Sequence, residues 1–248
     1  MVNIKDIYKQ YLRDIIDYGE EVTKDNNHHL KERLGNYYRI EDPLDLKYTV
    51  KYKDYTHTQL LTDIKSGVYN LEGSPIKSDS LLEYVKSFEN SDDQGFVYTY
   101  PNRILAHFNI NQFNVMKNRL LNHPGSNRAV SITLDPELDS MRDDIPCLQL
   151  LQAIIRDNSL SMHCYFRSND IYGAFYSNMF FITYIGLKLK DELNLELHGN
   201  KLGFDGIYYY CSSGHIYRND YHSAKKLINQ GRVKKSIGMS MFNNLRHW

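Results

Sequence analysis

Residues 145–178 read IPCLQLLQAIIRDNSLSMHCYFRSNDIYGAFYSN, and this stretch decides the central part of the fold. Two apolar runs, 147–155 and 159–166, are separated by the polar pair Asp157 and Asn158. Apolar runs of this length, joined by two residues that favour tight turns, are typical of a β-hairpin. The sequence therefore predicts two antiparallel strands here.

The same stretch carries candidate functional side chains. Cys147 follows a proline at the start of the hairpin, and a thiol can serve as a nucleophile when a nearby cation lowers its pKa. Arg167, Asp170 and Asn178 lie at the end of the hairpin and in the apolar segment after it. We interpret Cys147 as a nucleophile and the other three as residues that converge on its substrate. The alternative for Cys147 is a buried structural cysteine, which is how we interpret Cys164 and Cys211.

Helices and strands alternate along the rest of the chain. Apolar periodicity and turn residues predict helices at 3–24, 57–66, 80–88, 109–121, 170–193 and 217–230, and strands at 39–53, 129–134 and 206–211. A turn is expected at 212–214. Because no linker or repeat interrupts this alternation, we predict one α+β domain over 1–248, with 233–248 as a C-terminal tail.

Composition excludes several function classes. The 248 residues include 30 basic and 30 acidic side chains, so net charge favours neither nucleic acid nor a membrane as partner. The longest apolar run, 179–187, is too short to cross a bilayer, and the N-terminus does not resemble a signal peptide. Three cysteines argue against a disulfide framework and favour the cytoplasm. The pair His28 and His29 lacks ligands at metal-binding spacing, so no metal is expected.

Four motifs, in this order, resemble the thymidylate synthase family, and most closely its short archaeal and phage-like branch. They are IPCLQLL from residue 145, YFRSND from residue 165, an asparagine eight residues after Asp170, and HIY from residue 215. The resemblance covers roughly residues 1–230. It implies a large twisted mixed sheet with helices on one face, in a homodimer whose subunits pack sheet to sheet. It also implies one-carbon transfer to C5 of a pyrimidine nucleotide, with 5,10-methylenetetrahydrofolate as co-substrate.

The resemblance assigns the nucleophile to Cys147 and phosphate binding to Arg167 and Arg128. A guanidinium matches a phosphate dianion, and Arg167 can also stabilise the thiolate. In the family, the residue at position 128 reaches into the site of the partner subunit. Many members have a second arginine just before it, where this chain has Asn127. A further basic residue is expected after the first helix, and both Lys24 and Arg33 are candidates.

The base and the sugar have their own candidate residues. Asn178 matches the residue that reads the base, where an amide can donate to O4 of uracil and accept from N3–H, so it favours dUMP over dCMP. His215 and Tyr217 match the pair that binds the sugar 3′-hydroxyl, and Ser168 is expected to contribute to the nucleotide pocket.

Asp170 matches the contact to the folate pterin ring, and it is also a candidate N-cap for the following helix. Tyr98 matches the tyrosine that helps remove the C5 proton. The family's acid/base glutamate has no clear counterpart, and Glu83 and Glu89 are the available carboxylates. The well-known members also place a tryptophan near the reacting carbon, whereas the single tryptophan here is Trp248.

Three functions follow as hypotheses. The first is a thymidylate synthase that methylates dUMP. The second is a pyrimidine-nucleotide hydroxymethylase on the same scaffold, acting on dUMP, dCMP or a ribonucleotide, because exclusion of water decides between the two products. The third is a non-catalytic homologue that binds a nucleotide, which is motivated by Asn127 and by the unplaced glutamate.

Overall fold

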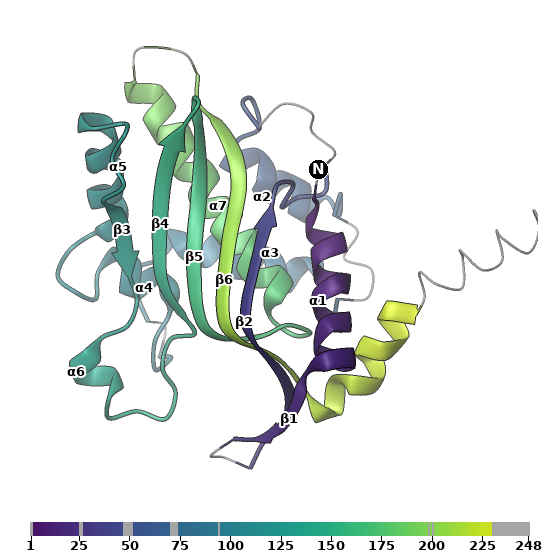
Figure 1. Ribbon diagram of the computed structural model, residues 1–248. Helices are drawn as coiled ribbons and strands as arrows, with labels where there is room; N and C mark the ends of the chain where they lie inside the picture. The colour runs from purple at the N-terminus through teal and green to yellow at the C-terminus, as the bar shows by residue number, and fades with distance from the viewer. Residues whose placement is uncertain are drawn as a thin grey trace, which may run out of the picture.

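The computed structural model describes residues 2–24, 27–46, 52–69, 74–93, 95–197, 199 and 201–229 (Figure 1). Its strands are β1 (Glu20–Thr23), β2 (His29–Ile40), β3 (Ala129–Ile132), β4 (Leu148–Arg156), β5 (Ser159–Asp170) and β6 (Gly203–Tyr217). Its helices are α1 (Ile4–Tyr18), α2 (His57–Lys65), α3 (Ser78–Lys86), α4 (Tyr100–Leu105), α5 (Gln112–Asn122), α6 (Pro136–Asp139) and α7 (Phe175–Glu196). Short 3-10 turns lie at Ser87–Glu89 and Arg218–Asp220, and residues 221–229 are helical.

The strands form one six-stranded sheet in the order β1-β2-β6-β5-β4-β3. Neighbouring strands are antiparallel except β5 and β6, which are parallel. Parallel neighbours need a long crossover connection, and α7 supplies it. The expectation of an α+β fold with a mixed sheet is therefore confirmed.

The hairpin of β4 and β5 turns at Asp157 and Asn158, as the sequence predicts. Both residues have positive φ, 47° and 58°, and Arg156 pairs with Ser159 across the turn. Asn and Asp tolerate this left-handed conformation better than other non-glycine residues, and two consecutive positive φ values match the twist of a two-residue hairpin. The local sequence is sufficient to specify this turn.

Helix α7 is buried on nearly every side, which explains why its sequence is apolar all round rather than amphipathic. It packs on β5 and β6 with one side and on α2, α3 and α5 with others. Gly186 allows this close approach to the sheet, because a Cβ there would lie 2.5 Å from the ring of Phe204. The helix is thus the centre of the hydrophobic core.

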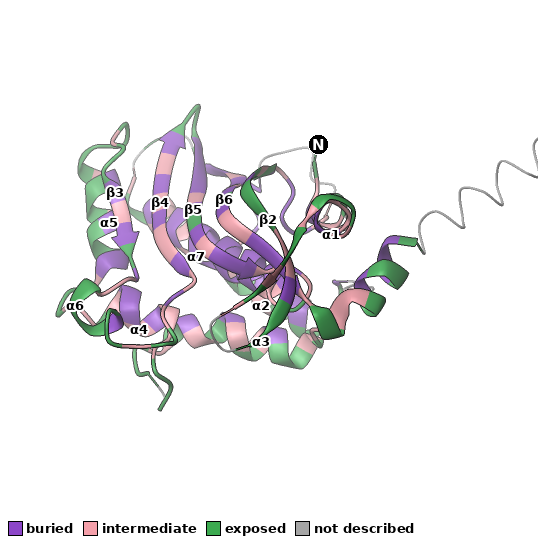
Figure 2. Ribbon diagram, turned by 60° about the horizontal axis from the view of Figure 1, so that its bottom comes forward, coloured by how far each residue is buried: buried purple, intermediate pink, exposed green. Residues whose placement is uncertain are grey.

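Helices α2, α3 and α7 cover one face of the sheet, and in Figure 1 they lie behind it. Figure 2 shows the same layering from another side, with the helices below the sheet. Aromatic side chains are exposed on the opposite face of the sheet, where Tyr37, Tyr165 and Tyr210 are 52%, 42% and 40% accessible. The rings of Tyr37 and Tyr210 pack against each other across neighbouring strands at 4.9 Å.

Four secondary-structure predictions need correction. The first helix ends at Tyr18 rather than at 24, and the strand β1 follows it. The strand predicted at 39–53 is His29–Ile40, because this segment pairs along its length with β6. Residues 212–214 do not turn but continue β6, which is held between β2 and β5. The long helix begins at Phe175, and its N-cap is Ala174 rather than Asp170. The predicted tail 233–248 lies outside the described residues.

Candidate active site

Cys147 is half-buried and immediately precedes β4, and Arg167 lies beside it near the end of β5. The backbone N–H of Arg167 donates to the carbonyl of Cys147 at 2.9 Å. Its guanidinium donates to the carbonyls of Pro146 (3.1 Å) and Ile145 (2.8 Å). These bonds use two of the five guanidinium N–H groups, so the side chain holds the Cys147 segment in place and can still bind an anion.

Two cations act on the Cys147 thiol. Burial raises its pKa above the ordinary value for a thiol, and the charges of Arg167 and Lys24 offset only part of this rise. The pKa of Lys24 is lowered by burial, and the nearby Arg167 lowers it further. Arg33 instead forms an ion pair with Asp14 at 2.8 Å. Of the two basic candidates in the N-terminal part, the structure therefore brings Lys24 and not Arg33 next to Cys147.

Three tyrosines, Tyr84, Tyr98 and Tyr100, lie close enough to Cys147 for a thiolate charge to act on them, and we call them the tyrosine cluster. Burial raises the pKa of each, and a Cys147 thiolate raises it further. The hydroxyl of Tyr100 accepts the N–H of Leu148 at 3.1 Å. Tyr98, the tyrosine to which the resemblance assigns removal of the C5 proton, belongs to this cluster. Tyr84 and Tyr100 were missed, since nothing local distinguishes them among 21 tyrosines.

Asn178 lies on the first turns of α7 and takes part in a chain of hydrogen bonds. The hydroxyl of Tyr84 donates to Asn178 Oδ1 at 2.9 Å, and Asn178 Nδ2 donates to Asn169 Oδ1 at 3.0 Å. Asn169 Nδ2 in turn donates to the hydroxyl of Tyr209 at 3.0 Å. The contact with Tyr84 links Asn178 to the surroundings of Cys147.

His215 and Ser168 are close neighbours on β6 and β5, with His215 Nδ1 and Ser168 Oγ at 3.3 Å. Burial lowers the pKa of His215 to about 4, and the nearby Lys24 adds to this effect. The imidazole is therefore neutral at pH 7. Its Nε2 is buried and has no hydrogen-bond partner within the described part of the chain. The ring of Tyr217 packs edge-on against it at 5.0 Å, and Lys24 Nζ lies 5.9 Å from the centre of that ring.

Tyr172 and Gly173, which follow Asp170 in the chain, line a cavity of about 550 Å³ together with Lys77 and Asp220, whereas Asp170 itself is not part of the lining. Its Oδ1 accepts the N–H of Gly173 at 3.0 Å, so it stabilises the turn before α7. Burial raises the pKa of Asp170, although the N–H of Gly173 opposes this effect. Asp170 therefore holds in place Gly173, a residue of the cavity wall.

Several candidates lie apart from Cys147. Arg128 is exposed at the start of β3, opposite Ile154 in the register that pairs Ala129 with Ala153. At about 3.4 Å per residue, that position is roughly 20 Å along the strand from Cys147. Glu89 bonds to the hydroxyl of Tyr184 and to Lys188 farther along α7, and Glu83 is exposed on α3. Trp248 lies outside the described residues.

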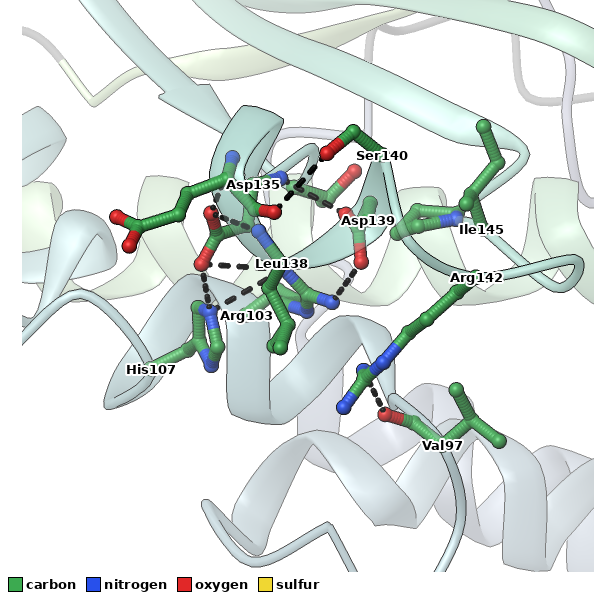
Figure 3. A network of polar contacts seen from close by, with 12 residues as sticks. Val97, Arg103, His107, Asp135, Leu138, Asp139, Ser140, Arg142 and Ile145 are labelled. Carbon is green, nitrogen blue, oxygen red and sulfur yellow. Dashed lines mark hydrogen bonds and ion pairs between the residues drawn. The ribbon is translucent and has the colours of Figure 1, made fainter.

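The segment that leads into Cys147 is held by a polar network around α4 and α6 (Figure 3). The buried guanidinium of Arg103 donates to Asp139 at 2.5 Å, and His107 contacts Asp135 at 2.6 Å. Arg142 donates to the carbonyl of Val97 at 2.9 Å, which ties this segment to the residues just before Tyr98. The network thus fixes residues on both sides of the site.

Among the described residues, no group of three or more His, Cys, Asp or Glu side chains is arranged to hold a metal ion. No described helix has the length and apolar character that a membrane span requires.

Comparison with known proteins agrees with this arrangement. The family profile for thymidylate synthase matches residues 6–244. A protein of Methanothermobacter thermautotrophicus named "Putative thymidylate synthase" is 30% identical over 228 residues, which cover 91% of this chain and 95% of that protein. Proteins with the same name are 29% identical in Methanothermobacter marburgensis, covering 93% and 98% of the two chains, and 27% identical in Methanosarcina barkeri, covering 91% of each. The chain therefore belongs to the thymidylate synthase family.

Proposed function

We propose that this protein methylates dUMP at C5 to give dTMP, with 5,10-methylenetetrahydrofolate as co-substrate. The observation that carries the proposal is the position of the half-buried Cys147 thiol beside Arg167 and Lys24. Two cations next to a thiol favour its reactive thiolate and also attract a phosphorylated substrate.

The nucleotide would be bound by residues from the strands β5 and β6 and the helix α7, and by Lys24, which directly follows β1. Arg167 has three guanidinium N–H groups left for the phosphate, and Lys24 adds a second positive charge. The buried Nε2 of His215, together with Tyr217, offers hydrogen bonds to the sugar hydroxyl. Ser168 contacts His215 and orients its ring. Asn178 would read the base.

Cys147 would start the reaction by adding through its sulfur to C6 of uracil, which turns C5 into a nucleophile. The folate supplies the one-carbon unit and then the hydride that reduces it. After C5 has formed its new bond, its proton must leave to a water molecule, and the protonated hydroxyl of Tyr98 would hold that water by a hydrogen bond. Loss of the sulfur from C6 then frees Cys147 and the product.

The second substrate would bind in the cavity lined by Tyr172 and Gly173, directly after Asp170. The cavity volume of about 550 Å³ suits a molecule of the size of a folate headgroup. Asp170 can pair with pterin N–H groups, and its position at the end of β5 places it near the nucleotide residues of the same strand.

A second candidate function is 5-hydroxymethylation of dUMP, dCMP or a ribonucleotide. The observation that favours it is the composition of the cluster around Cys147, which in the described residues holds tyrosines and no tryptophan. Phenol hydroxyls can hold water where an indole excludes it. Water would then quench the intermediate before reduction.

The active protein would be a homodimer. Arg128 lies roughly 20 Å along the sheet from its own Cys147, and the exposed tyrosines leave one face of the sheet available for a second subunit. Pairing of two such faces would let Arg128 reach the phosphate of the partner's nucleotide.

The test is mass spectrometry of the products after incubation with 5,10-methylenetetrahydrofolate and dUMP, dCMP or UMP. We expect dTMP and dihydrofolate from dUMP, and no product from Cys147→Ala. A hydroxymethylated nucleotide with release of tetrahydrofolate would replace the proposal by the second candidate. Tight nucleotide binding without any product would instead indicate a non-catalytic homologue.

A further inference from the structure

The chain of hydrogen bonds through Asn178 joins side chains from four elements: Tyr84 on α3, Asn178 on α7, Asn169 on β5 and Tyr209 on β6. Every bond in the chain has the same direction, from Tyr84 toward Tyr209, with distances of 2.9, 3.0 and 3.0 Å. Asn178 and Asn169 are only 6% and 2% exposed, so solvent does not replace these partners.

The two hydrogen-bond partners of Asn178 fix the orientation of its side-chain amide, with the oxygen toward Tyr84 and the nitrogen toward Asn169. A side-chain amide has two N–H donors and an oxygen with two acceptor positions. Tyr84 uses one acceptor position and Asn169 uses one N–H. One acceptor position and one N–H are left for a ligand, and their order in space is set by Tyr84 and Asn169.

An asparagine whose side-chain amide can rotate freely does not by itself distinguish uracil from cytosine. Uracil presents a donor at N3 and an acceptor at O4, whereas cytosine presents an acceptor at N3 and a donor at N4. The asparagine amide can match either base, because a half-turn about the Cβ–Cγ bond exchanges the positions of its oxygen and its nitrogen. Discrimination therefore requires other residues that prevent the half-turn.

We propose that Tyr84 and Asn169 are positioning residues that hold the Asn178 amide in the orientation that reads uracil and rejects cytosine. This inference rests on the proposed role of Asn178 as the base reader. A half-turn would place the Asn178 oxygen against the Asn169 oxygen, and two buried acceptors without a proton between them are unfavourable. Binding of cytosine would require the whole chain of hydrogen bonds to reverse.

The experiment measures the dissociation constants of dUMP and dCMP for the full-length protein by isothermal titration calorimetry. The variants are Tyr84→Phe, which removes the donor to Asn178, and Asn169→Leu, which removes the acceptor. We expect each variant to reduce the preference for dUMP over dCMP by about tenfold, the usual effect of one hydrogen bond to a buried group. Asn169→Asp keeps an acceptor at this point and should keep the preference.

Tyr100→Phe is the matched control, because it removes a hydroxyl of the same tyrosine cluster that bonds to Leu148 and not to Asn178. It should change the affinities for both nucleotides by the same factor. A preference that stays the same in Tyr84→Phe and in Asn169→Leu, with dUMP still bound, would overturn the inference and leave the proposed function intact. A wild-type protein that binds neither nucleotide and forms no product would overturn both.

Discussion

At the scale of single residues, the reactivity of Cys147 depends on a balance between burial and charge. Burial raises the pKa of the thiol, while Arg167 and then Lys24 lower it. Arg167 also donates hydrogen bonds to the backbone before Cys147. Its removal would therefore change both the charge near the thiol and the position of the Cys147 segment. Lys24 offers the cleaner test.

We expect Lys24→Gln to slow alkylation of Cys147 by iodoacetamide. Loss of this cation removes a charge that stabilises the thiolate, so the pKa of Cys147 rises and the thiolate fraction at a given pH falls. On the rising part of the pH profile the reaction should be roughly threefold slower. The rate measured from pH 6 to 10 would give a curve displaced toward higher pH. The other two cysteines are buried and should not react in the folded protein.

Arg33→Gln is the matched control, since Arg33 pairs with Asp14 away from the thiol. Its pH profile should coincide with that of the wild type. If Lys24→Gln and Arg33→Gln gave the same profile, Lys24 would have no electrostatic role at Cys147.

At the scale of secondary-structure elements, α4 and α6 depend on tertiary contacts. They contain 6 and 4 residues, far fewer than an isolated helix needs for stability. The ion pair between Arg103 and Asp139, whose side chains are both 1% exposed, connects them and fixes the segment before Cys147.

Asp139→Ala is expected to lower the free energy of unfolding by about 3 kcal/mol, because it leaves the buried guanidinium of Arg103 with only the more distant Asp135, at 4.0 Å, as counter-charge. Urea denaturation followed by circular dichroism would measure the change. The control is Asp54→Ala, which breaks an ion pair with Lys201 on the surface and should leave the unfolding midpoint unchanged. Equal effects of the two substitutions would contradict a special role of the buried pair.

At the scale of the whole molecule, the proposed dimer makes a prediction about shared sites. Cys147→Ala and Arg128→Glu should each be inactive as homodimers. A hybrid dimer combines the intact Cys147 of one subunit with the intact Arg128 of the other. Random exchange of subunits should therefore restore about a quarter of the wild-type activity, since half of the dimers are hybrids and each has one complete site. The measurement is dTMP formation after mixing and equilibration.

Arg167→Gln mixed with Cys147→Ala is the matched control for this experiment. Arg167 contacts the Cys147 segment of its own subunit, so no hybrid has a complete site and activity should stay absent. Recovery in this control as well, or in neither mixture, would contradict the role of Arg128 in the partner's site.

Local sequence was sufficient for the elements whose signals are local. The turn at Asp157 and Asn158 follows from residues that accept positive φ, and α5 begins after Asn111, whose side chain caps it. The helices at 57–66 and 80–88 also follow from periodicity, and α7 was recognised as a long buried helix. Motif order indicated the family and drew attention to Cys147, Arg167 and Asn178.

Tertiary structure decided what depends on distant residues. Segment 29–40 is a strand because β6 pairs with it, and 212–214 continue a strand because β2 and β5 lie on both sides. Lys24 rather than Arg33 lies near Cys147 because of how the chain returns after α1. Tyr84 and Asn169 are separated by many residues from each other, and only the packing of α3 and β5 around α7 brings both to Asn178.

The sequence by itself determined the hairpin, the buried helix and the identity of the nucleophile candidate, because turn preference, periodicity and motifs are properties of neighbouring residues. The surroundings of that nucleophile were decided only by the folded chain, because hydrogen bonds and charges act through space.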